Sequence, residues 1–361
     1  MRISRAPRPL TALLAVLRRM VTVPTVVMVD VALLATAPVS FAAAAVVALL
    51  TRSTRPLRTV ALVAAYAVIE LSVVPRLVGG EERDWDELLR EVLGRAYRAM
   101  EVILDVRIVV ESGSAEAEQL RGAGGVVVLA RHCGPGDSLF IAWLLAVRYH
   151  LRLRVVLTAL LRLEPAVDLA GDHLPLCFIG HNRRRARARV EDLAGSMRAG
   201  DVLLLFPEGG NFSWPRWRRS VAELSASGAD RRARRFLRNT HTLPPRLGGT
   251  MAALAGAPTA DVLLLAHSGF TDDGRDRPLW RLPTHRDLLV RTDLVPASAV
   301  PRGDEEALST WLDRAWTQID GWVENQAGPA APVHRHGGPG LLPRASGRKA
   351  LLRRTRCRDR R

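Results

Sequence analysis

Lysine and cysteine are scarce in this 361-residue sequence. Lys349 is the only lysine among 52 basic residues, so arginine carries almost all of the positive charge. The three cysteines, Cys133, Cys177 and Cys357, are scattered and form no CxxC pair. This spacing argues against a disulfide framework and against a zinc site. We therefore expect a chain that works in a reducing compartment and holds no metal.

Acidic residues number only 36, so the net charge is +16 and an acidic partner is expected. Hydrophobic residues make up 48% of the sequence, enough to bury a core, which excludes disorder over the whole length. Residues 328–361 hold ten basic residues against one acid and show no apolar periodicity. We therefore predict a basic disordered tail over residues 327–361.

Arginines also cluster at residues 183–189 and 231–238. Each cluster fits either a solvated helix face or contacts with anionic membrane lipids, which attract each nearby arginine by about 1 kcal/mol. Neither cluster has interleaved aromatic residues or a helix-turn-helix pattern, which argues against a nucleic-acid partner.

Two apolar stretches near the N-terminus, residues 20–50 and 57–77, have the length of membrane helices. The first carries a single charge, Asp30, and would form about 46 Å of helix, longer than the hydrocarbon core of a bilayer. A cleaved signal peptide would have a shorter apolar region, and a buried hairpin of a soluble protein is the other alternative. We predict a basic segment over residues 1–19 and a membrane hairpin over residues 20–78.

The charges that flank this hairpin predict its orientation. Arginines precede the first stretch and fill the short link between the two stretches, so the positive-inside rule favours a cytoplasmic position for both flanks. A re-entrant hairpin in one leaflet would have the same pattern. We expect a protein of the cell membrane whose catalytic domain faces the cytoplasm.

Residues 79–326 have the pattern of an α/β domain. An amphipathic helix is expected at 85–104, because apolar residues recur there at three- and four-residue steps. Short, continuous apolar runs then alternate with helix-length segments, which predicts a largely parallel sheet flanked by helices. The predicted strands are 106–110, 126–130, 154–158, 176–179, 202–206 and 262–266, and further helices are predicted at 137–150, 184–198 and 304–325.

The strand at 126–130 is followed by His132 and, five residues later, by Asp137. Sites in parallel α/β sheets are built at the carboxyl ends of strands. The turn formed by Gly134 and Gly136 can bring the Asp137 carboxylate onto one imidazole nitrogen of His132, which raises the basicity of the other nitrogen. Such a pair can take a proton from an alcohol. A capping aspartate beside an ordinary loop histidine has the same sequence pattern.

A second strand, at 202–206, runs into a turn that contains Glu208, Gly209 and Gly210, 76 residues after His132. The His-x4-Asp and Phe-Pro-Glu-Gly segments resemble, in order and spacing, the HxxxxD and FPEG blocks of the glycerolipid acyltransferase family. Residues 176–183 and 239–246 are similar to two further blocks, the latter to the "HLLPPR" block of the branch that acylates lysophosphatidic acid and related lysolipids. The resemblance implies a glycerol-3-phosphate acyltransferase-like fold.

This resemblance also implies the roles of the site residues. His132 would be the general base and Asp137 would stabilise its imidazolium, while Glu208, Gly209 and Gly210 would order the polar head of the acceptor. The family's usual cations are replaced by His181 and Asn211, so an anion clamp would consist of Arg246 with Arg183 or Arg184.

The resemblance further implies acyl-CoA or acyl carrier protein as co-substrate, no cofactor and a lysophospholipid acceptor, in first place 1-acyl-sn-glycerol-3-phosphate. The product would be phosphatidic acid, for phospholipid biosynthesis. An acyltransferase of another lysolipid head group is one alternative, and a catalytically lapsed protein that binds anionic lipid is another. A serine hydrolase with Ser138 as nucleophile would lack the GxSxG elbow.

Overall fold

A computed structural model of the chain describes residues 9–80, 84–121, 125–134, 136–270 and 283–326. The tail that we predict over 327–361, and the first eight residues of the basic segment over 1–19, lie outside the described residues. The described residues belong to one compact unit.

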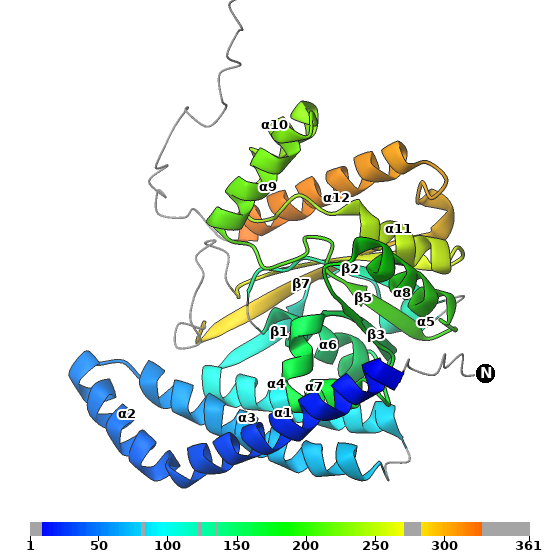
Figure 1. The fold of residues 1–361 in the computed structure, drawn as a ribbon. Coiled ribbons are helices and arrows are strands. Elements are labelled where there is room, and N and C mark those ends of the chain that lie inside the picture. Colours follow the sequence, from blue (N-terminus) through cyan, green and yellow to red (C-terminus); the bar gives the residue numbers. More distant parts are fainter. Residues whose placement is uncertain (1–8, 81–83, 122–124, 135, 271–282, 327–361) are drawn as a thin grey trace, which may run out of the picture. The chain divides into compact units, whose positions relative to one another are not determined.

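A seven-stranded sheet forms the centre of this unit (Figure 1). Its strand order is β1-β7-β6-β2-β5-β3-β4, and every neighbouring pair is parallel except β6 with β7. The strands are β1 (Val106–Val110), β2 (Val126–Ala130), β3 (Arg152–Thr158), β4 (Leu176–Ile179), β5 (Asp201–Leu205), β6 (Asp261–Ser268) and β7 (Arg286–Val295). The predicted α/β class with a largely parallel sheet is confirmed.

Helices cover both faces of the sheet, because the central strands are buried on both sides. Alternate residues of β2 belong to two different cores, with Val128 in the core beneath α4 and α6 and Leu129 in the core beneath α8, α11 and α12. The first face carries α4 (Trp85–Leu104), α6 (Asp137–Trp143), the π-helical turn η1 (Leu144–Arg148), the 3₁₀ turn η2 (Ala159–Leu163) and α7 (Pro165–Ala170). The remaining helices are α5 (Ala117–Arg121), α8 (Arg183–Gly195), α9 (Trp214–Ala226), α10 (Asp230–Phe236), α11 (Leu247–Gly256), the 3₁₀ turn η4 (Ala297–Ala299) and α12 (Glu305–Gln326).

Three N-terminal helices form a further layer, of which the first and the third pack against α4 and α7 (Figure 1). They are α1 (Pro9–Ala35), α2 (Ala37–Thr51) and α3 (Arg55–Gly79). The first apolar stretch is therefore broken at Thr36, one residue before α2, which has a proline in its first turn. Two segments, Ala12–Ala35 and Arg55–Gly79, are long and apolar enough to cross a membrane by length and composition alone.

α3 lies along α4 over most of its length. Near its start, Arg58 donates a hydrogen bond of 2.6 Å to the carbonyl oxygen of Ile103. Further along, Arg95 of α4 donates to the Ser72 hydroxyl at 2.8 Å, and near the end Arg76 pairs with Glu91 at 2.7 Å. α3 is therefore held against α4 at both ends and along its length.

Candidate active site

His132 and Asp137 meet at the carboxyl end of β2, as the sequence predicts. The Nδ1 atom of His132 lies 2.9 Å from both carboxylate oxygens of Asp137. The chain turns between them through Gly136, whose φ of +93° is a left-handed conformation that favours glycine. A Cβ atom at Gly136 would lie 2.9 Å from the Phe270 ring, so the turn also needs glycine for space.

The carboxylate of Asp137 is fully buried and accepts several hydrogen bonds. Besides Nδ1 of His132, the backbone N–H groups of Cys133 and Gly134 donate to it, at 2.6 and 3.1 Å. Burial acts to raise the pKa of Asp137, but the hydrogen bond and charge of His132, with the backbone donors, outweigh it and hold the pKa below its usual value. Asp137 is thus an anion placed to stabilise a protonated His132.

The imidazole of His132 presents its second nitrogen away from Asp137. Its side chain is 20% exposed and packs against the ring of Phe206, with centroids 4.4 Å apart. Within the described ranges, the Nε2 atom has no hydrogen-bond partner. Since Nδ1–H is fixed by the carboxylate, Nε2 carries the lone pair and is the atom that can accept a proton.

A second buried histidine supports the same loop. His267, in β6, has its Nε2 atom 2.9 Å from the carbonyl oxygen of Arg131 and its Nδ1 atom 3.7 Å from the Cys133 sulfur. Cys133, Asp137 and His267 come close enough together to hold a metal ion. Because the atoms of all three already make protein contacts, we interpret the group as a support for the loop that carries His132 and Asp137. The sequence pattern did not single out His267, which is 135 residues from His132.

Glu208, at the end of β5, is buried and bonded to two backbone segments. One carboxylate oxygen accepts from the N–H of His132 at 3.0 Å, and the other accepts from the N–H of Leu243 at 2.8 Å. Only 2% of the residue is exposed. Both carboxylate oxygens of Glu208 thus accept from backbone N–H groups, and the side chain ties the His132 loop to the segment before Arg246.

The pKa of Glu208 leads to a prediction about stability. Burial raises this pKa to about 7, against the hydrogen bonds from Leu243 and His132 and the charge of Arg131. The folded chain therefore retains a proton that the unfolded chain releases between pH 4.5 and 7. We expect the stability that this group contributes to fall by up to about 3 kcal/mol as the pH rises through that window.

Glu208→Gln, which cannot titrate, is the control for this prediction. The melting temperatures of the wild type and the variant are measured in detergent at pH 5 and pH 7.5. The melting temperature of the glutamine variant, relative to that of the wild type, should be higher at pH 7.5 than at pH 5. A difference that does not change with pH would contradict the prediction.

The two glycines after Glu208 lie beneath arginine side chains. A Cβ atom at Gly209 would be 3.2 Å from the Cδ atom of Arg246, whose backbone N–H donates to the Pro207 carbonyl at 2.8 Å. Gly210 lies beside Arg216, which donates to the carbonyl oxygen of Asn211. Arg216 thus brings a cation to the loop where Asn211 replaces one. In the sequence, Arg216 could be found only as an arginine that stands five residues after Asn211, at the start of a helix.

The arginines of α8 lie near the edge of the sheet. Arg183 and Arg184 begin α8 after β4, the edge strand three places from β2 in the sheet, and both are exposed. At about 4.8 Å per strand this puts them roughly 14 Å from the strand of His132. Arg187 reaches further, because a Cβ atom at Gly248 of α11 would lie 2.9 Å from its Nε atom. Arg187 is therefore the α8 arginine that contacts the helix following Arg246.

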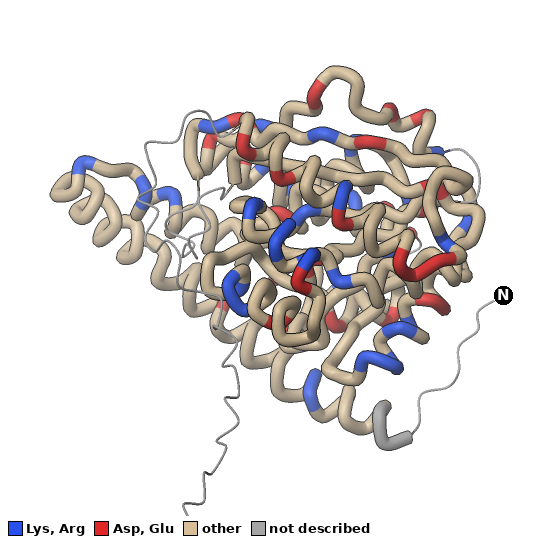
Figure 2. The backbone as a smooth tube through the Cα atoms, turned by 90° about the horizontal axis from the view of Figure 1, so that it is seen from above, with Lys and Arg blue, Asp and Glu red and all other residues tan. Residues whose placement is uncertain are grey.

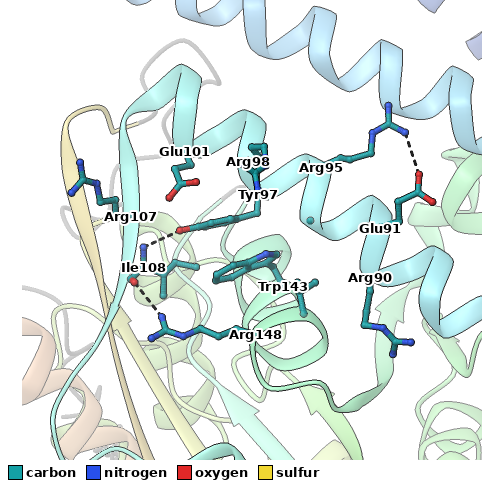
Figure 3. Close-up of a pocket in the computed structure, with 12 residues that line it drawn as sticks. Arg90, Glu91, Arg95, Tyr97, Arg98, Glu101, Arg107, Ile108, Trp143 and Arg148 are labelled. Atoms are coloured by element: carbon teal, nitrogen blue, oxygen red, sulfur yellow. Dashed lines mark hydrogen bonds and ion pairs between the residues drawn. The ribbon is translucent and has the colours of Figure 1, made fainter.

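A cavity of about 650 Å³ lies elsewhere, between α4, β1 and η1 (Figure 3). Tyr97 and Trp143 stack in it with centroids 3.7 Å apart, and Tyr97 accepts a hydrogen bond from the N–H of Ile108. Its charged lining residues are Arg90, Glu91, Arg95, Arg98, Glu101, Arg107 and Arg148. None of the candidate site residues lines it.

Two comparisons with known proteins give matches. Residues 113–256, which include His132, Asp137, Glu208 and Arg246, match the family described as Acyltransferase. A crystal structure of the 1-acyl-sn-glycerophosphate acyltransferase PlsC from Thermotoga maritima is similar at 17% sequence identity and a TM-score of 0.49, with 76% of this chain and 98% of that chain covered. No curated protein matches the chain.

Proposed function

Residues 113–256 match the acyltransferase family model, and from this match we propose that the chain is a membrane-bound lysolipid O-acyltransferase. The donor is acyl-CoA or acyl carrier protein, and the first acceptor to consider is 1-acyl-sn-glycerol-3-phosphate. The observation that carries the proposal is the His132–Asp137 pair, bonded through Nδ1 at 2.9 Å with Nε2 facing away from the carboxylate. This pair is placed to deprotonate an acceptor hydroxyl.

The proposed reaction is direct acyl transfer. Nε2 of His132 takes the proton of the acceptor hydroxyl, and the oxygen attacks the thioester carbonyl of the donor. The tetrahedral intermediate collapses with release of the donor thiolate, which takes the proton back from the imidazolium. Asp137 stabilises the imidazolium while it exists, because its pKa is held low and it stays ionised. No acyl-enzyme is required.

In this proposal, the charged head group of the acceptor binds over Gly209 and Gly210. Arg246 and Arg216 lie next to these two glycines and are both exposed, so their guanidinium groups can pair with a phosphate. Arg183 and Arg184 add positive charge at the same edge of the sheet, further from His132. A panel of lysolipids with different head groups, each offered with radiolabelled acyl-CoA and acyl carrier protein, tests the assignment. Transfer to no lysolipid of the panel would contradict it.

The Arg-lined cavity of Figure 3 supports a second candidate function, binding of anionic membrane lipids without catalysis. Within the described residues, Arg98 and Arg107 have no ion-pair partner, and Arg95 reaches Ser72 of the hairpin. An anionic head group could therefore bind beside the membrane layer. A protein that binds anionic vesicles but never releases thiol from acyl-CoA would favour this candidate.

For the membrane attachment, we propose that the hairpin is inserted in the cytoplasmic leaflet of the cell membrane. Between Arg19 and Arg52, α1 and α2 carry one charged residue, Asp30; charged residues along the chain are coloured blue and red in Figure 2. α3, however, is bound along α4, whose charges, such as Arg98 and Glu101, are costly to place in hydrocarbon. This arrangement supports a hairpin that lies in one leaflet with the catalytic domain outside it.

Membrane attachment should resist high salt. The exposed apolar surface of α1 and α2 is insensitive to screening, whereas contacts made by arginines alone weaken when the Debye length falls to about 3 Å in 1 M salt. The full chain should remain in the membrane pellet in 1 M NaCl and leave it only in detergent. Release by salt would show that the arginines, and not the hairpin, hold the protein on the membrane.

A further inference from the structure

The turn η2 exposes three leucines next to the active-site edge of the sheet. Leu160, Leu161 and Leu163 are 72%, 38% and 59% exposed. Among the described residues after Gly79, the only other large apolar side chains as open to solvent are Val102, Val109 and Leu237. A turn that faces water normally carries polar residues. Three exposed leucines in one turn therefore indicate a surface that contacts an apolar partner instead of water.

Ion pairs fix this turn against the start of the hairpin. Arg162, between the leucines, pairs with Asp168 at 3.1 Å and lies over the Phe178 ring at 4.2 Å. Asp168 is fully buried and also binds two arginines of α1, Arg18 at 2.7 Å and Arg19 at 3.0 Å. The leucine turn therefore has a fixed position relative to α1.

The neighbouring surface of α1 is also apolar. Leu14 and Leu17, which precede the two arginines in α1, are 55% and 51% exposed, and Val21 just after them is 66% exposed. On the other side, Tyr66 of α3 donates to Glu164, the residue that follows the turn, at 3.0 Å. The leucines of η2 are thus held, through Asp168 and Glu164, beside the two helices by which the hairpin is proposed to contact lipid.

The turn is also close to the proposed reaction site in the sheet. η2 follows β3 at the same carboxyl edge at which β2 carries His132, and only β5 lies between the two strands. Two strand spacings amount to about 10 Å. An acyl chain that leaves the leaflet at this turn can therefore reach His132 without crossing the sheet.

We propose that Leu160, Leu161 and Leu163 insert into the same leaflet as the hairpin and form the membrane-side border of the path along which acyl chains reach His132. The occupant of this surface is the lipid bilayer. The path rests on the proposed acyltransferase function, whereas the insertion does not.

The first test measures insertion without using activity. Leu160→Cys, in a Cys357→Ser background, is labelled with an environment-sensitive NBD fluorophore, since Cys133 and Cys177 are buried. Leu237→Cys, at the end of α10 against the core of the other sheet face, is the matched control. On phosphatidylcholine–phosphatidylglycerol vesicles with doxyl-labelled lipid, the label at position 160 should shift to the blue and be quenched. Quenching no stronger than at position 237 would overturn the insertion.

The second test concerns the path. Leu160→Asp/Leu163→Asp is compared with Leu237→Asp, using a long-chain lysolipid in vesicles and a short-chain, water-soluble acceptor and donor. The double variant should lose at least about tenfold in rate on the vesicle substrate, because an inserted leucine is replaced by a charge, and less than about twofold on the soluble one. Equal losses on both substrates, or none on the vesicle substrate, would overturn the path. If the wild type shows no acyl transfer, the proposed function fails and the quenching still decides the insertion.

Discussion

Replacing His132 with alanine is expected to abolish acyl transfer. In the proposed reaction Nε2 of His132 takes the proton of the acceptor hydroxyl, so the hydroxyl would lose its general base. General-base catalysis alone contributes about 10²- to 10⁴-fold. The measurement is kcat/KM for lysolipid acylation by purified protein. A His132→Ala variant with near-wild-type activity would show that the pair is not the catalytic base.

Asp137→Asn separates the charge of this pair from its shape. Asparagine fills the same space, but it cannot stabilise an imidazolium, and its amide group opposes one of the backbone donors at Cys133 and Gly134. The corresponding change in a Ser-His-Asp triad lowers kcat by about 10⁴-fold, and a loss of that order is expected here. Binding of acyl donor, followed by fluorescence or calorimetry, should survive both substitutions and so exclude misfolding.

Arg246→Ala should reduce the acylation of a phosphate-bearing acceptor strongly. Arg246 lies directly over Gly209, and Arg216 is the other arginine placed beside these glycines; His181 and Asn211 stand where the resemblance would place cations. Loss of a bidentate, charge-assisted contact costs about 1.5–3 kcal/mol, or roughly 10- to 150-fold in kcat/KM. Arg246→Lys should restore little, because an ammonium group lacks the planar fork of donors.

The comparison between acceptors decides whether Arg246 acts on charge. The loss should appear with lysophosphatidic acid and shrink with a neutral monoacylglycerol. Arg219→Ala, an exposed arginine of α9 without an ion-pair partner among the described residues, is the matched control and should have little effect. Equal losses for charged and neutral acceptors would mean that Arg246 has a structural role.

Features of the fold that depend on neighbouring residues were predictable from the sequence. The strand at residues 176–179 is observed at those bounds, and five residues of spacing suffice to bring His132 onto Asp137. The strand β7 was not among the strands predicted from apolar runs, because polar residues alternate with apolar ones along it. It pairs antiparallel with β6, so it has a different pattern from the doubly buried strands.

Contacts between distant segments could not be predicted in the same way. The resemblance implies that Glu208 orders the acceptor. The hydrogen bond that Glu208 accepts from the N–H of Leu243 depends on the position of a loop 35 residues away, which the local sequence does not indicate. The pairing of Arg18 with Asp168 spans 150 residues, and nothing in either local pattern indicates it. These long-range contacts decide how the hairpin and the catalytic loop are held.

Thiol release by the purified full chain tests the central claim most directly. With acyl-CoA as donor, release of free CoA should depend on added lysolipid, should match the diacyl product in amount, and should be absent in the His132→Ala variant. No release with any lysolipid, or undiminished release by His132→Ala, would contradict an acyltransferase that works through His132 and Asp137.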